Sequence, residues 1–554
     1  MRVGRQDLCA ALARLTPEEA AEALKYRYLP IAWQPGLALY VAGDAAAGHE
    51  AARRGLPVIA EVPPGEFAAA LERAYGRAIV EEASWGLAQT SPHLSAVRRL
   101  TPTQAMGLAA MLVMLAMAGL VDPGAAGLAL SLLCALFFLA VIGLRVMSLV
   151  APGRKNAIRP ARLGPDDLPV YTVLVPLYRE TNIVRQLIAG LEAIRYPRHK
   201  LDIKLVLEES DIYMRRAVAR LDLKAPFEVL TVPCLGPQTK PKALNYGLAF
   251  ARGDLVTIYD AEDIPEPRQL LHAAALFAAA PPEVACLQAS LAFYNPGENW
   301  LTRQFAAEYA MLFDLLLPVL AGLGMPLPLG GTSNHFRRRA LERIGGWDPH
   351  NVTEDADLGI RLARLGYEAA TFGSTTNEEA NCDLANWLSQ RARWLKGWLQ
   401  TWLVHMRRPV VLWQEVGAAG FVVIQTLMLG TLVSALAHPL FLGWTVWRLA
   451  SGRFFPPLTD TVSFVMTALA LAVLVAGYAV TMLAGLVALE CRGLGRLWPA
   501  VLTMPVYWLV LSLGGWLAVW QFICAPFHWN KTRHGLTRHG PTGIGRRDVG
   551  AGHC

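Results

Sequence analysis

Long apolar runs constrain the fold of this chain more than any other feature of its sequence. Two of them, 105–121 and 124–144, are separated only by Asp122 and Pro123, and three more follow at 416–447, 462–489 and 498–527. Each is long enough, or nearly so, to cross about 30 Å of hydrocarbon as a helix. The mean hydropathy of +0.32 agrees with this reading. The sequence therefore predicts a multi-pass membrane protein with soluble parts.

Basic residues flank the first two runs on both sides. Arg98 and Arg99 precede the pair and Arg145 follows it. Since positive charge stays on the cytoplasmic side, we expect a hairpin with both ends in the cytoplasm. The basic tail should stay inside too, but three single crossings near the carboxyl end would leave it outside. One of those three blocks is therefore predicted to be a hairpin or re-entrant.

The soluble parts divide into segments with different patterns. Residues 1–100 predict a small α/β module with helices at 17–26 and 67–75 and strands at 37–42 and 56–62. In 151–381, strand-like runs alternate with helical ones, which predicts an α/β fold with a parallel sheet covered on both faces. Its expected strands are 170–175, 203–207, 227–232, 255–259 and 284–288, with helices at 183–193 and 242–251. We expect a hairpin at 101–150, interfacial helices at 382–410, membrane helices at 411–527 and a basic cytoplasmic tail at 528–554.

Composition excludes several other classes of protein. The eight cysteines are scattered without paired spacing, which argues against a zinc site or a disulfide framework and suits a reducing compartment. No cleavable signal peptide is visible in the charged first hundred residues. The net charge of +7 is explained largely by arginines beside membrane segments, so it indicates no nucleic-acid partner.

An abrupt cluster of acids follows the apolar run 255–259. Asp260, Glu262 and Asp263 come directly after it. A buried parallel strand delivers such acids to the carboxyl edge of a sheet, where open α/β folds bind ligands. Carboxylates at this spacing suit a hard divalent cation, Mg²⁺ or Mn²⁺, that also holds phosphate oxygens. Whether Glu262 or Asp263 accompanies Asp260 as a ligand stays open, and an acidic turn that caps a helix is the alternative.

Three more motifs surround this cluster in order: the strand and polar turn 173–180, Thr353-Glu354-Asp355, and Gln390-Arg391-Ala392-Arg393-Trp394. Together they cover about 166–410. Over this stretch the chain resembles the inverting, membrane-embedded synthases of glycosyltransferase family 2, the group of cellulose, chitin and hyaluronan synthases. The resemblance implies a GT-A-like domain between transmembrane helices, a nucleotide-sugar donor and a bacterial-type inner (cytoplasmic) membrane location with a cytoplasmic catalytic domain.

The resemblance also implies which residues bind the donor. Tyr178 and Glu180 match the site for the nucleotide base, and Glu208 and Glu209 match an acidic pair after the second strand. Lys242 is the better match to a diphosphate-facing lysine in the stretch 240–245. Asp260 would also contact the nucleotide, and Arg393 can offer a fork of donors to the diphosphate.

Residues on the acceptor side follow from the same resemblance. Asp355 matches the general base, with Glu354 beside it at the acceptor, although acids in the first turn of a helix also favour its dipole. Gln390 and Trp394 match a platform on which a sugar ring stacks, and an interfacial anchor is the alternative.

Near the carboxyl end, Thr532 and His534 resemble part of a mobile gating loop. The alternative for this region is a basic tail that binds membrane lipid headgroups.

The first hundred residues look like the amino-terminal domain of type II secretion ATPases, on the stretches 28–31, 39–42 and 71–76. Some relatives of that domain bind cyclic di-GMP through an Arg-Leu-Gly motif. No clear copy of the motif is present in 1–100, so we expect a docking or packing module.

Two functions follow from the resemblance. The first is extension of a β-linked polysaccharide at the cytoplasmic face, coupled to export and an export partner. The alternative is a single transfer to a lipid carrier or a membrane lipid. A receptor that has lost turnover is a third class, and the intact acids Asp260, Asp263 and Asp355 speak against it.

Overall fold

The computed structural model describes residues 5–34, 37–43, 45–62, 64–151, 158–452, 454, 461–525 and 535–537. The chain divides into two compact units, each assembled from several segments. The first unit comprises 1–91, 158–289 and 330–350, and the second comprises 92–157, 290–329 and 351–554. Residues 290–329 and 351–381, which belong to the predicted catalytic domain 151–381, therefore lie in the second unit.

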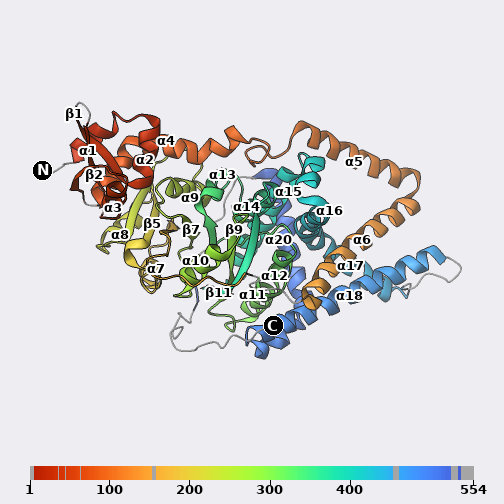
Figure 1. Ribbon diagram of the computed structural model, residues 1–554. Coiled ribbons are helices and arrows are strands. Elements are labelled where there is room, and N and C mark those ends of the chain that lie inside the picture. The colour runs from red at the N-terminus through yellow and green to blue at the C-terminus, as the bar shows by residue number, and fades with distance from the viewer. Residues whose placement is uncertain are drawn as a thin grey trace. The chain divides into compact units, whose positions relative to one another are not determined.

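The first unit begins with a small α/β module (Figure 1). Its elements are α1 (Arg5–Leu12), α2 (Pro17–Tyr26), β1 (Tyr28–Gln34), β2 (Leu37–Ala42), α3 (Ala45–Arg53), β3 (Val58–Glu61) and α4 (Pro64–Thr90). The strands form one sheet, in which β1 pairs antiparallel and β3 pairs parallel with β2. Helix α2 begins where the sequence predicts, because Thr16 and Glu19 form a capping box. Helix α4 is much longer than the predicted 67–75.

A larger sheet forms the centre of the first unit. Its strands are β4 (Tyr171–Leu177), β5 (Leu201–Glu208), β6 (Phe227–Val232), β7 (Leu255–Ile258), β9 (Val284–Phe293) and β10 (Asn334–Arg337). They are hydrogen-bonded in the order β6-β5-β4-β7-β10-β9. The four strands from β6 to β7 are parallel, as predicted, but β10 runs antiparallel to both neighbours. The sheet is therefore mixed. Strand β10 was missed because its four residues are mostly polar and show no apolar period.

Short helices connect these strands. They are α7 (Val184–Glu192), the 3₁₀ turn Arg198–Lys200, α8 (Ile212–Ala219), α9 (Lys240–Ala249), α10 (Gln269–Ala279) and α13 (Arg338–Arg343). The two-residue strand β8 (Ile264–Pro265) follows the acid cluster. Helices α7 and α9 confirm the two that the sequence predicts between strands.

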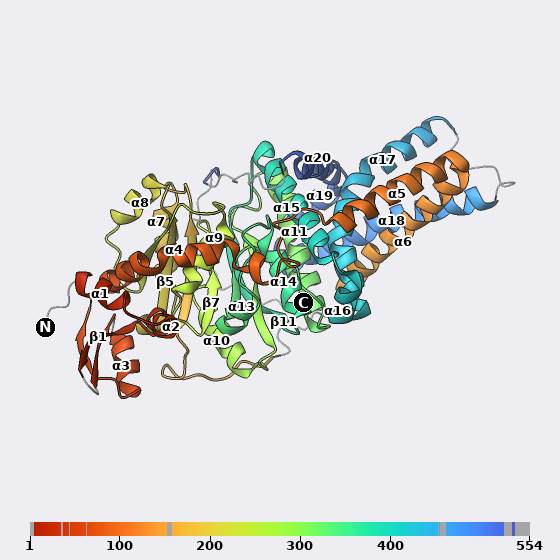
Figure 2. The same cartoon turned by 90° about the horizontal axis from the view of Figure 1, so that it is seen from above.

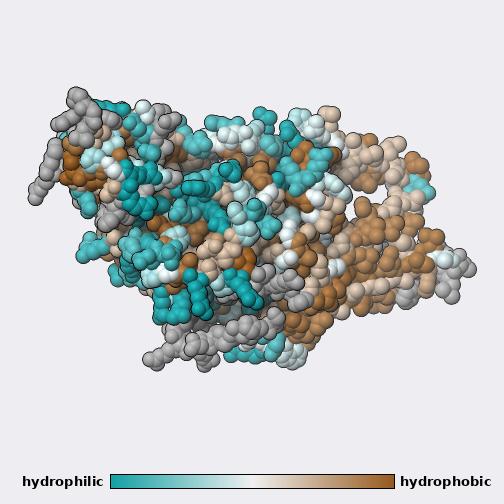
Figure 3. Space-filling model, viewed as in Figure 1, coloured by the Kyte–Doolittle hydropathy of each residue, from teal (hydrophilic) through white to brown (hydrophobic). Residues whose placement is uncertain are grey.

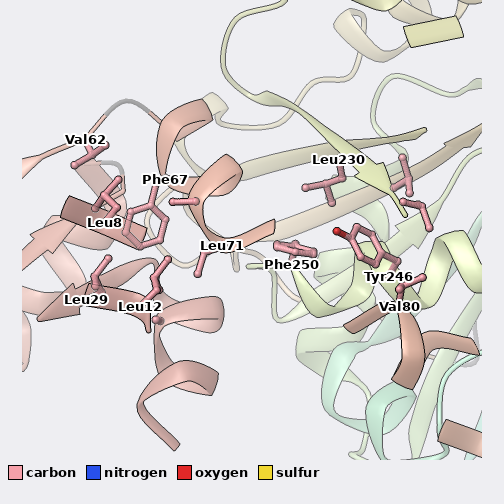
Figure 4. Close-up of a cluster of buried hydrophobic side chains, with 14 of the residues drawn as sticks. Leu8, Leu12, Leu29, Val62, Phe67, Leu71, Val80, Leu230, Tyr246 and Phe250 are labelled. Carbon is pink, nitrogen blue, oxygen red and sulfur yellow. The ribbon is translucent and has the colours of Figure 1, made fainter. Parts of the chain in front are cut away.

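One hydrophobic core joins the N-terminal module to the edge of the larger sheet. Leu12, Phe67 and Leu71 of the module share it with Leu230 of β6 and Phe250, which follows α9 (Figure 4). Helix α4 carries most of this contact, packing along β6 and α9. Since the edge of a sheet presents unpaired backbone groups, this cover protects β6 from pairing with another chain.

The second unit is mostly helical. It contains α5 (Pro102–Val121), α6 (Pro123–Val150), α11 (Trp300–Ala310), the π-helical turn Met311–Leu316, α12 (Leu317–Gly322), α14 (Glu354–Arg364), β11 (Glu368–Glu378), α15 (Leu384–His405), α16 (Pro409–Ile424), the π-helical turn Gln425–Leu429, α17 (Gly430–Ala450), α18 (Thr461–Cys491), the 3₁₀ turn Gly495–Leu497, α19 (Trp498–Val501) and α20 (Met504–Cys524). Helices α6 and α18 lie side by side in both ribbon views (Figures 1 and 2). The surface over α5, α6, α17 and α18 is almost uniformly hydrophobic (Figure 3).

Six helical segments among the described residues are long and apolar enough to cross a membrane. One of them, Trp300–Gly322, was not predicted from the sequence. In that segment 61 % of the apolar window is buried inside the protein, against 0 % in α5 and 6 % in α6. Its apolar side chains therefore pack against protein, whereas those of α5 and α6 are available to lipid.

Helix α20 is apolar, and both of its ends are hydrogen-bonded to other segments of the second unit. Trp300 Nε1 donates to Thr503 Oγ1 over 2.8 Å at its start, and Arg99, which precedes α5, donates to the carbonyl of Ile523 over 3.1 Å at its end. Gln104 at the start of α5 also donates to the carbonyl of Leu403 in α15, over 2.7 Å. The start of α5 is therefore joined to both α15 and α20.

The other candidate crossings are α5, α6, the rod formed by α16 and α17, and α18. The rod bends at Gly417, whose φ of 70° is left-handed. The predicted hairpin within one C-terminal block is not found among the described residues.

Among the described residues, Cys9, Cys134, Cys234, Cys286, Cys382 and Cys524 are free thiols.

Candidate active site

In the first unit, the acids after β7 form a closed turn. The Asp260 amide donates to Asp263 Oδ2 over 2.7 Å, and the Asp263 amide donates to the Asp260 carbonyl over 3.2 Å. The Thr332 hydroxyl also donates to Asp263 Oδ2. Asp263 is only 2 % exposed, yet its Oδ1 has no hydrogen-bond partner. One carboxylate oxygen therefore holds the turn, and the other is a buried acceptor that nothing satisfies.

This cluster concentrates negative charge. Burial raises the pKa of Asp263 well above its usual range, and the neighbouring Asp260 and Glu262 raise it further. A divalent cation would relieve this repulsion, and the unsatisfied Oδ1 offers it an oxygen ligand. The described residues contain no preassembled group of three metal-ligating side chains. The residues present therefore fit a cation that completes its coordination with ligands from outside the chain, such as phosphate oxygens.

Two lysines near the start of α9 have different partners. Lys240 Nζ lies 2.5 Å from Asp260 Oδ1 and donates to the Gly331 carbonyl over 2.7 Å. Lys242 is fully buried and donates to Glu208 Oε2 over 3.1 Å. The lysine at the acid cluster is thus Lys240, whereas the sequence favoured Lys242. The Lys-Pro-Lys pattern holds both residues, and only the helix start shows which one reaches the acids.

Glu208 and Glu209 end β5 in unlike surroundings. Glu208 is buried, and burial raises its pKa although the Lys242 ammonium partly offsets this. Glu209 is exposed and accepts the amide of Cys234 over 3.0 Å. The first acid is therefore engaged in a buried ion pair, and the second holds a loop.

Tyr178 and Glu180 lie in the turn after β4, and both are half-buried. Between them Arg179 has a φ of 55°, and its amide donates to Asp211 Oδ2 over 2.6 Å. The Arg179 guanidinium lies 4.9 Å from the centre of the Tyr178 ring. A left-handed residue makes the turn sharp, and Asp211 secures it from the start of α8.

In the second unit, Glu354 and Asp355 open α14. Glu354 is buried, whereas Asp355 is half-buried and accepts the Ala356 amide on Oδ1 over 2.7 Å. A hydrogen bond to the adjacent amide fixes the carboxylate at the positive end of the helix dipole.

Helix α15 holds the start of α14 in place. Asn351 Nδ2 donates to Thr401 Oγ1 over 2.9 Å, and the Val352 amide donates to Gln400 Oε1 over 3.3 Å. A Cβ on Gly397 would lie 2.4 Å from Thr353 Cγ2, so glycine allows the close approach of the two elements. Asp355 is therefore set by the same helix that carries Gln390, Arg393 and Trp394.

Buried charges fasten these two helices further along. Asp357 pairs with Arg361 at 2.7 Å and with His405 of α15 at 3.1 Å, and all three are fully buried. The neighbouring Arg361 and His405 outweigh the effect of burial and hold the pKa of Asp357 below its usual range. Breaking such a pair would leave a buried charge unpaired, at a cost of about 3–5 kcal/mol.

Trp394 lies in an aromatic cluster. Its ring is stacked on Tyr309 at 6.3 Å between centroids and meets Phe305 edge-on at 6.0 Å. The guanidinium of Arg391 lies 4.8 Å from the Trp394 ring centre and forms a bidentate pair with Glu308 at 2.8 and 2.7 Å. Arg391 lies within the predicted motif but was assigned no role, and the structure makes it the residue that orders the cluster.

Gln390 and Arg393 complete the motif on α15. Gln390 Oε1 is buried and has no hydrogen-bond partner. Arg393 is half-buried, and it is the charged neighbour that, after burial, lowers the pKa of Lys396 to about 8. An unsatisfied buried oxygen marks Gln390 as a group with capacity for an external hydrogen-bond donor.

Thr532 and His534 lie outside the described residues. The three residues that follow them are held by Glu379, just after β11. Its carboxylate accepts the amides of Gly535, Leu536 and Thr537 over 2.5, 2.8 and 2.8 Å. Sequence reasoning missed Glu379, because nothing in its local pattern shows a partner more than 150 residues away.

Residues 255–523 match the family model described as glycosyl transferase family group 2. The chain is 28 % identical over 235 residues to a probable glycosyltransferase, YdaM, of Bacillus subtilis, covering 42 % of this chain and 56 % of that protein. It is 30 % identical over 247 residues to a β-monoglucosyldiacylglycerol synthase of Synechocystis, covering 43 % and 50 %. A third relative, cellulose synthase 1 of Komagataeibacter xylinus, is 26 % identical over 280 residues, covering 49 % and 17 %.

The chain spans about half the length, or less, of these curated relatives. Among solved structures, a mannosyltransferase from Pyrobaculum calidifontis in complex with GDP-Man and Mn²⁺ aligns with a TM-score of 0.41 at 22 % identity, covering 63 % of this chain and 98 % of that one. Residues 255–523 are thus similar to group 2 glycosyltransferases, and the named relatives support a glycosyltransferase enzyme.

Proposed function

We propose that this protein is a membrane glycosyltransferase that uses a nucleotide-diphosphate sugar as donor. The observation that carries the proposal is the acid turn after β7, with the unsatisfied buried oxygen of Asp263 and with Lys240 at 2.5 Å from Asp260. Acids and a lysine at one strand end suit a diphosphate, whose oxygens require a cation and a positive side chain.

The donor-side residues act on the leaving group. Transfer breaks the bond between the anomeric carbon and the phosphate oxygen, and negative charge grows on the nucleoside diphosphate. Asp260 and Asp263, with Glu262 beside them, would hold a Mg²⁺ or Mn²⁺ ion, which when bound neutralises this charge. Lys240 supplies a second positive charge. Tyr178, Glu180, Glu208, Glu209 and Lys242 remain proposed donor-binding residues.

Asp355 is the proposed general base. As an acceptor hydroxyl attacks the anomeric carbon from the side opposite the diphosphate, the Asp355 carboxylate takes its proton, and the configuration inverts. Its fixed position on α14 suits this role. Glu354, Gln390 and Trp394 would hold the acceptor sugar, and Arg393 would contact the diphosphate.

The proposed acceptor is the end of a growing β-linked polysaccharide, because an ordered indole such as Trp394 suits a sugar ring. A cellulose synthase among the relatives agrees with this choice. The second candidate is a lipid acceptor, and it is favoured by the relatives named as glucosyldiacylglycerol synthases. Export through the membrane helices, with or without a partner protein, belongs to the first reading alone.

We place the catalytic residues on the cytoplasmic side of a bacterial-type inner membrane, where nucleotide sugars are made. The N-terminal module serves as a packing module of the donor-side unit, in keeping with its shared core with β6. The docking role is also the one that we expect from its resemblance to the amino-terminal domain of type II secretion ATPases.

The decisive test is a screen of sugar nucleotides with purified protein in nanodiscs. Release of nucleoside diphosphate from one donor is expected, followed by analysis of radiolabelled product for chain length. Long products support the polysaccharide, and a single sugar on a lipid supports the alternative. Absence of transfer from every donor, with donor binding intact, would support the receptor reading and overturn the proposal.

A further inference from the structure

A large cavity lies among the membrane helices of the second unit. It has a volume of about 720 Å³ and is lined by α6, α17 and α18, with Trp508 and Leu511 of α20 at one end. Its lining extends along α6 from Gly124 to Arg145. At 1.5 Å per residue that stretch is about 30 Å long, which is the thickness of the hydrocarbon core.

Most of the lining is apolar, with leucine, alanine, phenylalanine and valine side chains from all three helices. The lining threonines Thr431, Thr445 and Thr467 already donate to carbonyls of their own helices. Many hydroxyl groups of a polysaccharide chain would therefore be buried there without partners, which is unfavourable. Acyl or isoprenoid chains have no such groups. The lining therefore suits the hydrocarbon part of a lipid.

Two charged residues line the cavity, Arg145 near the end of α6 and Arg448 near the end of α17. Arg145 Nη1 donates a hydrogen bond to the Thr481 hydroxyl. The Arg145 guanidinium lies 5.8 Å from the centre of the Trp508 ring. Within the described residues Arg145 makes no salt bridge, and Glu308, the carboxylate that acts on it from a distance, is paired with Arg391. Four other arginines of this unit do have one: Arg361 with Asp357, Arg364 with Glu415, Arg391 with Glu308 and Arg492 with Asp314.

Polar aromatic groups gather at the same end. His438 Nε2 is 2.7 Å from the Tyr478 hydroxyl, and the rings of Tyr478 and Trp508 are stacked at 5.3 Å. His438 Nδ1 is buried without a partner. Tyrosine and tryptophan prefer the headgroup level of a bilayer, and an ionisable residue within a membrane segment marks a functional site by default.

We propose that this cavity binds a lipid whose headgroup carries a phosphate, with the phosphate on Arg145 and the hydrocarbon along α6, α17 and α18. The planar fork of a guanidinium matches phosphate oxygens, and no salt bridge of Arg145 among the described residues competes with the ligand. The length and the apolar lining of the cavity account for the rest of the lipid. The site does not depend on the proposed transferase activity.

The test measures lipid binding without any nucleotide sugar. Purified protein in detergent is titrated separately with dioleoylphosphatidylglycerol, with a polyprenyl monophosphate and with dioleoylglycerol, and bound lipid is counted by native mass spectrometry. Both phosphate lipids are expected to bind at least about tenfold more tightly than dioleoylglycerol, because only they can form charge-assisted hydrogen bonds with Arg145. The tighter of the two phosphate lipids identifies the source of the ligand.

Variants locate the site. Arg145→Met should lose the preference for phosphate, Arg145→Lys should keep most of it, and Ala470→Trp should weaken all three lipids by filling the cavity. Arg496→Gln is the matched control, because this arginine lies outside the cavity lining and should bind lipid as the parent does. If Arg145→Lys folds and Arg145→Met does not, the comparison of Arg145→Lys with Ala470→Trp still decides whether lipid occupies the cavity.

Two results would overturn the inference: equal binding of dioleoylglycerol and the phosphate lipids, or unchanged phosphate preference in a folded Arg145→Met. Failure of the proposed activity would look different. In that case lipid binding would follow the pattern above while no sugar nucleotide is consumed.

Discussion

The donor-side and acceptor-side residues are held by different kinds of structure. Asp260 and Asp263 depend on backbone amides at the end of β7, inside a continuous sheet. Asp355 and Trp394 depend on side chains that join two helices and an aromatic cluster, among them Thr401 and Arg391. Since the two groups lie in separate compact units, changes in one should leave the task of the other largely intact. The predictions below test that separation.

Removal of divalent cations should have the largest effect. With excess chelator, both donor binding and turnover should be lost, because the acid turn then faces the diphosphate as unpaired negative charge. Donor binding is measured by calorimetry with the nucleoside diphosphate, and re-addition of Mg²⁺ or Mn²⁺ should restore it. Full turnover in chelator would show that the acids serve only to cap the turn.

Asp355→Asn should lower turnover by at least about a hundredfold, the usual scale for a lost general base, and leave donor affinity nearly unchanged. The amide keeps the size and the hydrogen bond to Ala356, so the fold is preserved. Asp383→Asn is a matched control, because Asp383 caps α15 and has no proposed catalytic role. A parallel collapse of donor affinity would make Asp355 a donor ligand.

On the donor side, Lys240→Ala and Lys242→Ala should change different properties of the protein. Loss of Lys240 should weaken nucleoside diphosphate binding by about tenfold, as expected for one charge-assisted contact. Loss of Lys242 should instead lower the thermal midpoint, because Glu208 would keep a buried, unpaired charge. The reverse assignment would support Lys242, the lysine favoured by the sequence.

Trp394→Ala should damage chain extension more than hydrolysis of the donor by water. Hydrolysis needs the acid turn and Lys240, whereas extension also needs a saccharide end held close to the anomeric carbon, and a displacement of about 1 Å can cost on the order of a hundredfold. Polymer formation and donor hydrolysis are compared in equal amounts of folded protein. An equal fall in both would identify Trp394 as an anchor of the helix.

Glu72→Gln should have the smallest effect, on stability and not on catalysis. Glu72 of α4 accepts the amide of Thr231 over 2.7 Å, and burial raises its pKa from 4.5 to about 7. The stability associated with its protonated form is complete below pH 4.5 and is lost as the pH rises through 7. Glutamine keeps the acceptor without the charge. The variant should therefore unfold at a higher temperature than the parent at pH 8 and at a similar temperature at pH 4.5.

The part of the fold that could be predicted from the sequence is the part with local signals. The β-branched apolar runs in the sequence predict strands β4 to β7. The acids follow the end of β7, as the pattern indicates. Strand β10 pairs with strands that are distant in the sequence, and Glu379 accepts amides of residues more than 150 positions away. Hydropathy alone did not indicate the buried apolar segment Trp300–Gly322, because a sequence does not show which apolar side chains pack against protein.

For the site, the motifs located the acids, the base and the Trp motif, but not the contacts that hold them. Lys240 and Lys242 have the same residue type two positions apart, and only the direction of α9 gives them different partners. The role of Arg391 could not be predicted either, because it depends on Glu308 in α11. The catalytic and binding residues were therefore easier to predict from the sequence than the contacts that hold them in place.

The topology of α20 has a consequence for how this protein is made. If α20 lies along the membrane surface, α5 with α6 and α17 with α18 enter the bilayer as two hairpins. The stretches translocated between the helices of each hairpin are then short: the turn at Asp122 has no basic residue, and the sequence of 451–460 holds one arginine and no lysine. The soluble parts of both units then fold on the side where the ribosome delivers them, and neither part has to pass through the translocation channel.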